Sequence, residues 1–337
     1  MDKKKLILVG NTVDEDWPFR RGVEKATGSP WDVKVCVINQ YNGIKKYTRF
    51  LTYFLGPMAL FFQCKRYSHI ISWEQFLGLI TVFFLRLFHV KNPPQITIMA
   101  LIYKPKKGLI GRVFEWFVRY TVTSDYVHKI VVYSQSEVDY YADYFGVSKD
   151  KFATELLGVA DRPDLYSTAQ PEEPYYVAAG RSNRDYAFLR DAWPKDEAPL
   201  MIICDVEKSE DTANIKYLKN CHGDEYLRLL AGARAALVPL QSEKFSSGQL
   251  VFLQSAMLGK PVITTPNDTV PDYIDQGRTG LIIQKTPEAL AQALDTLRDP
   301  ETYQQMCRNA RQAFEDRFSL FELGRRVGTH ALRGADK

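Results

Sequence analysis

The sequence is poor in cysteine, and the few cysteines that it has form no pattern. Its 337 residues include five, at positions 36, 64, 204, 221 and 307, and no two of them make a Cys-x-x-Cys pair. Regular cysteine spacing is typical of zinc sites and of disulfide frameworks in secreted domains. The scattered set argues against both, and we expect reduced thiols in a cytoplasmic protein.

A long uncharged apolar run is also missing. A membrane-spanning helix needs about 18–20 such residues. The longest comparable stretch, FLGLITVFFLRLFHV at 76–90, is interrupted by Arg86. The apolar run before Gly10 is too short for the core of a signal peptide, and it is better explained as a first buried strand. We therefore expect peripheral membrane attachment at most.

Acidic residues are scarce between Tyr41 and Ile130, where thirteen Lys and Arg residues accompany only Glu74, Glu115 and Asp125. This segment is also rich in aromatic residues, although the net charge of the whole chain is only +4. Basic and aromatic residues on amphipathic stretches are typical of surfaces that lie on anionic lipid. We expect this part to attach to the inner face of the cell membrane. The alternative is a set of ordinary core helices with solvated lysines. No nucleic-acid-binding motif accompanies the charge, so we expect no nucleic acid partner.

Short apolar runs alternate with helical patterns along the chain, which indicates doubly wound α/β domains. Buried parallel strands are predicted at 5–10, 32–39, 69–73, 95–101 and 129–134, then at 175–180, 200–205, 235–240, 261–265 and 280–284. Helices are predicted at 49–63, 75–89, 108–122 and 136–145, then at 184–193, 223–232, 247–258 and 270–276. A polar, proline-containing stretch at 160–174 is the best linker candidate.

Ligands of such sheets bind beyond the carboxyl ends of the strands. In the second half these positions hold Arg181, Arg184, Lys244, Ser246, Ser247, Gly248 and Gln249. Arginines near a glycine-containing helix start suit a diphosphate. Gln254, on an otherwise apolar helix, could reach a sugar hydroxyl. The alternatives are surface ion pairs for the arginines and a solvent-exposed Gln254.

One carboxylate in the first half follows a predicted strand, in the stretch IISWEQF. This residue, Glu74, could act as general base on an acceptor hydroxyl or could orient the sugar. The alternative is an acid at a helix start, favoured by the helix dipole. Gly10, Asn11 and Gln75 also follow strands and are candidates for the acceptor side. We expect no metal site.

The second half resembles the nucleotide-sugar glycosyltransferases of family four, which have the GT-B fold. The resemblance rests on AAGRSNRDY, on the stretch from HGDEY to GRTGLII, and on the closing TPEALAQALDTLRD helices, and it covers residues 128–325. It implies two Rossmann-like doubly wound domains that face each other across a cleft. We expect an acceptor-binding domain at 1–165, a donor-binding domain at 166–310, and a helix at 311–337 that crosses back to the first.

The resemblance also implies roles for particular residues. Arg181 or Arg184 would steady the diphosphate of the donor, and backbone N–H groups of Ser247 and Gly248 would bind it. Gln254 would meet the ribose, and His222 would lie near the base. The family commonly has two glutamates eight residues apart, and Ser246 and Gln254 stand in those positions here. A neutral pocket would tolerate an acidic donor sugar better than a carboxylate would.

The expected function is transfer of a sugar from a nucleotide-diphosphate sugar to a glycan or lipid-linked acceptor, in polysaccharide or glycolipid biosynthesis. The family mechanism is retaining and would need no cofactor and no obligatory metal. Two alternatives stay open: a non-catalytic nucleotide-sugar-binding subunit of a transferase complex, and a GT-B sugar-nucleotide epimerase.

Overall fold

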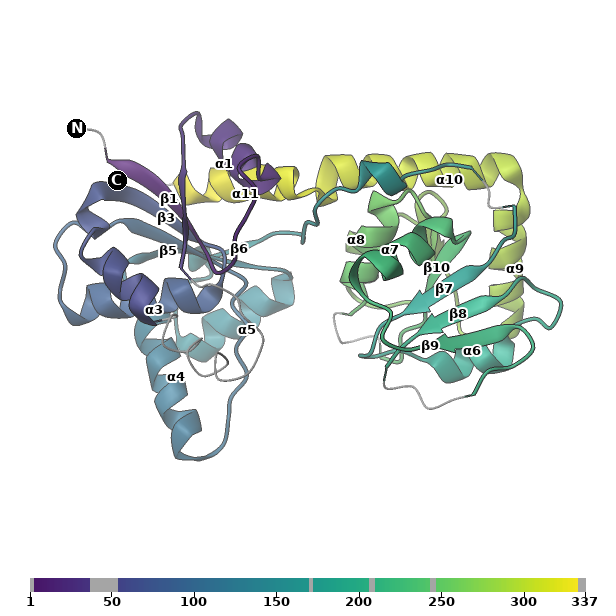
Figure 1. The fold of residues 1–337 in the computed structure, drawn as a ribbon. Coiled ribbons are helices and arrows are strands. Elements are labelled where there is room, and N and C mark those ends of the chain that lie inside the picture. The colour runs from purple at the N-terminus through teal and green to yellow at the C-terminus, as the bar shows by residue number, and fades with distance from the viewer. Residues whose placement is uncertain (1–2, 37–53, 170–171, 206–209, 243–246, 333–337) are drawn as a thin grey trace. The chain divides into compact units, whose positions relative to one another are not determined.

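A computed structural model describes residues 3–36, 54–169, 172–205, 210–242 and 247–332. The chain divides into two compact units, which Figure 1 shows together. Unit 1 consists of residues 1–156 and 321–337, and unit 2 of residues 157–320. The sequence placed these boundaries at 165 and 311 instead. They shift because Phe152–Thr154 adds a strand to the first sheet, whereas Val159 bridges to Ser319 in unit 2.

Unit 1 contains a parallel sheet of six strands in the order β2-β1-β3-β4-β5-β6. The strands are β1 Lys4–Val9, β2 Asp32–Val35, β3 Tyr67–Ser72, β4 Gln95–Met99, β5 Val127–Val132 and β6 Phe152–Thr154. The helices are α1 Pro18–Thr27, α3 Gln75–Leu87, α4 Gly108–Val122, α5 Gln135–Phe145 and α11 Leu320–Leu332. Residues 54–61 are also helical, and the start of the predicted helix at 49–63 lies outside the described residues.

Apolar runs form the centre of this sheet, because strands covered on both faces must be apolar throughout. Leu6 to Val9 of β1 are buried, and so are Ile96 and Ile98 of β4. The helix α5 begins where Ser134 accepts a hydrogen bond from the Glu137 N–H. It ends at Gly146, which adopts a left-handed conformation with φ 68°.

The last helix, α11, packs on α1 through glycines. A Cβ atom on Gly22 would lie 2.0 Å from the Phe321 carbonyl oxygen, and one on Gly324 would lie 2.1 Å from the Phe19 carbonyl oxygen. The buried Glu155 also accepts from Arg326 and pairs with His330 at 2.6 Å. These contacts attach the C-terminal segment to unit 1.

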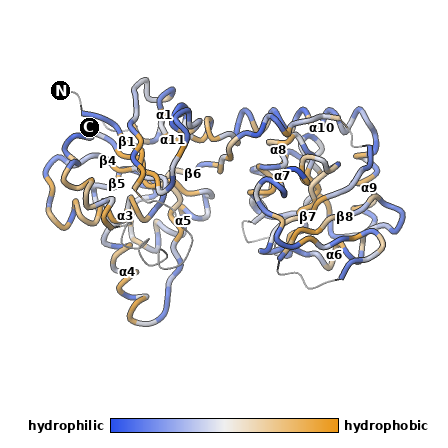
Figure 2. Tube along the Cα trace, in the orientation of Figure 1, coloured by the Kyte–Doolittle hydropathy of each residue, from blue (hydrophilic) through white to orange (hydrophobic). Residues whose placement is uncertain are grey.

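Unit 2 contains a second parallel sheet, in the order β12-β11-β10-β7-β8-β9. The strands are β7 Tyr176–Ala179, β8 Leu200–Ile203, β9 Ile215–Leu218, β10 Ala235–Val238, β11 Val262–Thr264 and β12 Gly280–Ile282. The helices are α6 Tyr186–Ala192, α7 Gly223–Gly232, α8 Gln249–Met257, α9 Pro287–Arg298 and α10 Pro300–Ala313, and a π-helical turn follows at Phe314–Phe318. Figure 2 shows that the strands of this sheet are mostly hydrophobic.

The prediction of two doubly wound α/β domains is confirmed by these two sheets. It was wrong in three details. The strands β6 and β9 were missed, because each is short and only partly apolar. The helix predicted at 270–276 is a single short turn, Val270–Asp272, that contains Pro271. Within the described residues, no helix combines the length and the hydrophobicity that crossing a membrane requires.

Candidate active site

The strand order of unit 2 reverses between β7 and β10. The chain connections that follow β7 and β10 run in opposite directions, which opens a crevice at the carboxyl ends of these two neighbouring strands. The loop after β7 carries Arg181 and Arg184, and the loop after β10 leads to Ser247 and Gly248 at the start of α8. Residues from two predicted strand ends therefore meet at one edge of the sheet.

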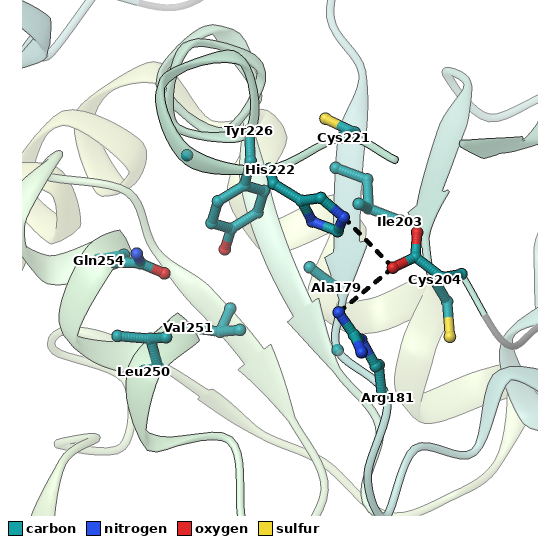
Figure 3. A pocket seen from close by; sticks show the side chains of 13 residues that line it. Ala179, Arg181, Ile203, Cys204, Cys221, His222, Tyr226, Leu250, Val251 and Gln254 are labelled. Atoms are coloured by element: carbon teal, nitrogen blue, oxygen red, sulfur yellow. Dashed lines mark ion pairs between the residues drawn. The ribbon is translucent and has the colours of Figure 1, made fainter. Parts of the chain in front are cut away.

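A cavity of about 280 Å³ lies at this edge (Figure 3). It is lined by Ala179, Gly180, Arg181, Ile203, Cys204, Asp205, Cys221, His222, Gly223, Tyr226, Leu250, Val251 and Gln254. Most of the wall is apolar, and its polar groups are few. Three of the predicted donor residues, Arg181, His222 and Gln254, line it.

Asp205 is the only carboxylate among these lining residues. One of its oxygens lies 3.3 Å from an Arg181 nitrogen and 3.3 Å from His222 Nε2. The other oxygen accepts a hydrogen bond of 2.8 Å from the Asn220 N–H, in a loop where Asn220 has φ 56°. Asp205 thus links the Arg181 and His222 side chains to the loop before α7.

The Arg184 guanidinium is half-buried beneath the turn after β7. It donates to the Ala179 and Ser182 carbonyl oxygens at 3.0 and 2.8 Å, and to Ser247 Oγ at 2.9 Å. No carboxylate pairs with it within the described residues. Burial lowers the pKa of Arg184 from its usual value, but an arginine remains charged at neutral pH.

Two glycines, Gly180 and Gly248, allow Arg184 to lie close to the backbone of this edge of the sheet. Gly180 has φ 126°, and a Cβ atom there would lie 2.8 Å from the Arg184 guanidinium. Gly248 is the N-cap of α8 with φ 93°, and among the described residues no side chain caps the first N–H groups of that helix. An uncapped helix start beside a half-buried cation is a site of positive potential.

Two further predicted residues of this loop, Lys244 and Ser246, lie outside the described residues. Ser247 is described, and besides accepting from Arg184 its hydroxyl donates to the Ser182 carbonyl at 3.1 Å. Gln249 is the first residue of α8 and is half-buried. The contact between Ser247 and Arg184 brings together residues 63 positions apart.

Two buried polar atoms point into the same space of the cavity in Figure 3: Gln254 Oε1 and the Tyr226 hydroxyl. Within the described part of the chain neither atom has a hydrogen-bond partner. Burial raises the pKa of Tyr226, so its hydroxyl is neutral and can donate. Buried polar atoms normally have partners, so this pair is suited to ligand hydroxyl groups.

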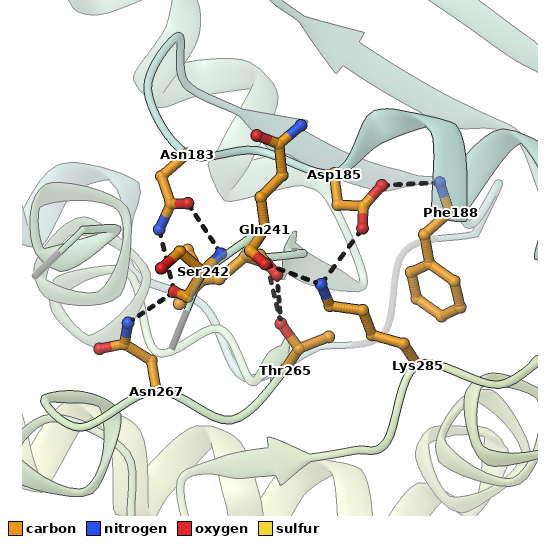
Figure 4. A network of polar contacts seen from close by, with 9 residues as sticks. Asn183, Asp185, Phe188, Gln241, Ser242, Thr265, Asn267 and Lys285 are labelled. Atoms are coloured by element: carbon orange, nitrogen blue, oxygen red, sulfur yellow. Dashed lines mark hydrogen bonds and ion pairs between the residues drawn. The ribbon is translucent and has the colours of Figure 1, made fainter. Parts of the chain in front are cut away.

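A network of amide and hydroxyl contacts fixes the loops around the cavity (Figure 4). Asn183, with φ 56°, accepts from the Ser242 N–H at 2.9 Å and donates to the Ser242 carbonyl at 3.2 Å. Asn267 donates to the same carbonyl at 3.0 Å, and Thr265 Oγ1 accepts from the Leu240 N–H at 2.8 Å. The loops after β7, β10 and β11 are therefore held together.

A second part of this network involves the start of α6. Asp185 caps that helix by accepting from the Phe188 N–H at 3.1 Å, and it also pairs with Lys285 at 3.2 Å. Arg184 lies just before the helix, not inside it as predicted, because Asp185 is the N-cap. The alternative pairing of Arg184 with Asp185 does not occur, since Lys285 takes that carboxylate.

In unit 1, Glu74 and Gly10 lie at the carboxyl ends of β3 and β1, where that strand order reverses. The Gly10 N–H donates to Glu74 Oε2 at 2.7 Å, and burial raises the pKa of Glu74. Glu74 is the N-cap of α3, but its carboxylate does not cap that helix. Glu74 therefore stands at a helix start, as the alternative expects, while its carboxylate accepts from Gly10.

The other predicted acceptor-side residues lie nearby in the fold. Gln75, the first residue of α3, accepts from the Ile102 N–H at 2.9 Å, so its side chain fixes the loop after β4. Asn11 follows Gly10 and is exposed. Trp73 packs edge-on against Trp17 and Phe19, with ring centroids 5.2 and 4.7 Å away. This aromatic cluster stiffens the backbone next to Glu74.

Sequence reasoning missed Asp205 and Tyr226 as site residues. Asp205 lies two residues after Ile203, the last residue of β8, so its position near a strand end was a signal that could have found it. Tyr226 lies one helical turn after His222, and only the three-dimensional arrangement places its hydroxyl in the cavity. Among the described residues, no cluster of His, Cys, Asp and Glu could hold a metal ion. That catalysis needs no metal stays a prediction.

Comparison with known proteins agrees with this geometry. Residues 174–299 match the family described as "Glycosyl transferases group 1". No curated protein sequence matches the chain. A solved glycosyltransferase from Rickettsia africae ESF-5 is 13% identical, with 99% of this chain and 100% of that chain covered and a TM-score of 0.63.

Two other solved structures are similarly distant in sequence. WaaG, a glycosyltransferase involved in lipopolysaccharide biosynthesis, is 13% identical over 98% of this chain and 100% of its own, with a TM-score of 0.57. HepE from Anabaena, in complex with UDP and glucose, is 14% identical over 97% of this chain and 98% of its own, with a TM-score of 0.59. These likenesses show the fold, which is GT-B.

Proposed function

We propose that the chain, which has the GT-B fold and whose residues 174–299 match the family "Glycosyl transferases group 1", is a glycosyltransferase that transfers a sugar from a nucleotide-diphosphate sugar to a glycan or lipid-linked acceptor. The reaction would belong to polysaccharide or glycolipid biosynthesis. Family four, which the chain resembles, retains the anomeric configuration of the sugar, and we propose the same outcome here. Unit 2 would hold the donor, and unit 1 would supply the acceptor-side residues.

The observation that carries this proposal is the half-buried Arg184, in the loop after β7, whose guanidinium lies against the start of α8. Its charge lacks a carboxylate partner within the described residues, and it contacts Ser247 beside the uncapped helix start. A cation in partly desolvated surroundings binds an anion more strongly than an exposed one does. The arrangement suits the diphosphate of a donor, which bears negative charge that grows as the sugar leaves.

Arg181 has a different environment from Arg184. Its side chain is 65% exposed and already paired with Asp205 at 3.3 Å. Exposed ion pairs contribute little free energy, and the carboxylate offsets the positive charge that a diphosphate would meet. We infer that Arg184 is the principal phosphate ligand and that Arg181 plays a lesser part.

The polar groups that line the cavity, among which Arg184 is not included, suit the nucleoside. Gln254 Oε1 can accept a hydrogen bond from a ribose hydroxyl, and the Tyr226 hydroxyl can donate one to a ribose oxygen. His222 lies at the opposite side of the cavity from Gln254 in Figure 3, where a base could reach it. HepE, which shares the fold, has been solved with UDP, and we propose a nucleotide of this kind as the ligand here.

The proposed donor preference rests on charge. Gln254 stands where family four commonly has a carboxylate, which removes a negative charge from the cavity. Asp205 adds one carboxylate that the sequence-based expectation of a neutral pocket did not include, but it is paired with Arg181 and His222. An acidic donor sugar therefore remains a hypothesis, to be tested directly by competition between neutral and acidic nucleotide sugars.

The proposed chemical step breaks the bond between the anomeric carbon and the diphosphate oxygen, and forms a bond from that carbon to an acceptor oxygen. The acceptor hydroxyl loses its proton. Glu74 is the candidate to accept or orient it, because burial raises the pKa of this carboxyl above its usual range and so makes it a stronger base. The hydrogen bond from Gly10 holds the carboxylate in place.

We also infer attachment of unit 1 to the inner face of an anionic membrane. The support is the excess of basic over acidic residues at 41–130, together with large apolar side chains that are exposed on that unit. Such attachment would bring a lipid-linked acceptor to the enzyme.

Product analysis tests the proposal. The full chain would be incubated with a panel of nucleotide sugars and a lipid extract, and the products identified by mass spectrometry. We expect transfer from one donor, together with release of its nucleoside diphosphate. Binding of nucleotide without transfer from any member of the panel would contradict the proposed reaction and favour a non-catalytic subunit.

A further inference from the structure

The N-terminal half of α4 is covered with exposed apolar side chains. Leu109 is 77% exposed, Ile110 84%, Val113 57% and Trp116 56%. Leu109, Val113 and Trp116 follow the helical spacing of four and three residues, so they share one side of the helix, and Ile110 lies next to them. Figure 2 shows the hydrophobic residues at this end of α4, where the helix extends beyond the sheet of unit 1.

The other half of α4 belongs to the core of unit 1. Val118 and Val122 are buried, and Phe117 packs against Phe83 of α3 with ring centroids 5.6 Å apart. The Arg119 guanidinium donates to the Tyr144 and Phe145 carbonyls. The helix is thus anchored at its C-terminal end, whereas Leu109, Ile110, Val113 and Trp116 at its N-terminal end are each more than half exposed.

Cations surround this apolar end. Lys104, Lys106 and Lys107 directly precede the helix, and Arg112 lies within it. Among the described residues none of the four has a carboxylate partner, and Lys106 lies over the Phe114 ring at 5.2 Å. The nearest acid in sequence, Glu115, accepts from the Tyr144 hydroxyl at 2.8 Å. The charge is therefore free to meet an external anion.

The loop that presents these residues is fixed at both ends. The Ile102 N–H donates to Gln75, and the Tyr103 N–H donates to the Tyr141 hydroxyl at 3.1 Å. At the helix start Gly108 has φ 83°, and a Cβ atom on Gly111 would lie 2.1 Å from the Lys106 carbonyl oxygen. The apolar side chains are thus held outward by the fold, on a turn that only small residues permit.

We propose that the N-terminal half of α4, with the lysines before it, is the element that enters the interface of an anionic lipid bilayer. The apolar side chains insert among the acyl chains, and Lys104, Lys106, Lys107 and Arg112 contact the headgroups. This inference rests on the proposed membrane attachment and assigns it to one helix. Helices that lie in a membrane interface combine inserted apolar side chains with basic residues. A protein partner would not require the four basic residues around the apolar end, which lack carboxylate partners among the described residues.

The assignment can be tested by vesicle binding of the full chain. Vesicles of phosphatidylcholine with and without phosphatidylglycerol would be mixed with wild type, Ile110→Ser, the pair Lys106→Gln and Lys107→Gln, and Tyr140→Ser as a matched control. Tyr140 is a large side chain of unit 1, 46% exposed on α5. We expect Ile110→Ser to weaken binding at least tenfold and the lysine pair to flatten the dependence on salt. The control should bind like wild type.

Tryptophan fluorescence gives an independent measurement. Trp17, Trp31 and Trp193 are buried and Trp73 is half-buried, whereas Trp116 is exposed, so Trp116 is well placed to report contact with lipid. Vesicles should shift the emission to the blue, brominated lipid should quench it, and Trp116→Phe should remove most of both effects. Unchanged vesicle binding of Ile110→Ser, or an unaltered spectrum on binding, would overturn the assignment to α4.

The outcomes separate this inference from the proposed function. Sedimentation of the vesicle-free protein would show whether the apolar end instead joins two copies of the chain. A dimer lost in Ile110→Ser, without vesicle binding, would overturn the lipid assignment. Nucleotide affinity and transfer to a water-soluble acceptor should be unaffected by the α4 variants. Loss of transfer in wild type would refute the reaction and leave the vesicle result intact.

Discussion

Removing the charge of Arg184 should weaken nucleotide binding far more than removing that of Arg181. The variant Arg184→Met keeps the length and apolar stem of the side chain but deletes the guanidinium. Arg181→Met is the matched control, because both residues are arginines in the same loop. The two differ in exposure and in pairing, since only Arg181 has a carboxylate partner within the described residues.

The expected magnitude follows from those environments. A charge-assisted hydrogen bond to a phosphate contributes about 1.5–3 kcal/mol, which corresponds to roughly 10- to 150-fold in Kd. We expect Arg184→Met to fall in this range. For Arg181→Met we expect less than about 1 kcal/mol, as for other exposed pairs, because the Arg181 side chain is mostly exposed and its charge is already offset by Asp205.

Arg184 also contributes to the structure of the loop, through its bonds to the Ala179 and Ser182 carbonyls. Thermal unfolding therefore accompanies the binding measurement. Arg184→Lys serves as a second variant, since it restores a positive charge without the forked geometry. Partial recovery of affinity in the lysine variant would identify charge as the cause.

Isothermal titration calorimetry with UDP and with GDP supplies the dissociation constants. The reasoning would be refuted if Arg181→Met weakened binding more than Arg184→Met. It would also be refuted if folded Arg184→Met bound both nucleotides like wild type.

Three further predictions concern residues at the carboxyl ends of the strands in the two sheets. Asp205→Asn should keep the bond from the Asn220 N–H and raise nucleotide affinity about threefold to tenfold by removing a negative charge; unchanged or weaker binding in calorimetry would count against this. Glu74→Gln should lower turnover more than donor affinity and remove the rise of kcat/KM with pH. Burial raises the folded-state pKa of Glu74, so wild type should lose stability as the pH rises from the ordinary glutamate range through that raised value. Glu74→Gln should not show this decline in melting temperature. Identical pH profiles of the two proteins would exclude Glu74 as the base. Gly10→Ala should be destabilising and lower turnover, since its Cβ would lie 2.6 Å from Glu74 Oε1; a variant with normal Tm and rate would contradict the close approach.

Much of the donor edge was predictable because parallel sheets bring all their strand ends to one side. Arg184, Ser247 and Gly248 belong to two such ends, and the structure brings them together. Exposure and pairing were not predictable, since they depend on neighbours that are distant in sequence. Arg181 and Arg184 look equivalent in the stretch GRSNRDY, yet Asp205, in the loop after β8, pairs with only one of them.

The same distinction holds for unit 1. Its excess of basic residues was visible in the sequence, but not which of them are used within the fold. Arg119 donates hydrogen bonds to backbone carbonyls of α5, while Lys104 and Lys107 lack carboxylate partners within the described residues. Glu74 likewise stood at a predicted strand end, but its bond to Gly10 joins positions 64 residues apart.

The sequence by itself determined the α/β class, the two sheets and the strand ends at which a ligand would bind, because hydrophobic periodicity and glycine placement are local properties. Tertiary structure alone decided which arginine has no carboxylate partner among the described residues. It also decided that Gln254 Oε1 and the Tyr226 hydroxyl are buried there without hydrogen-bond partners, and which end of α4 carries exposed apolar side chains. Burial and charge pairing are set by contacts between distant segments, and those contacts form only when the chain is folded.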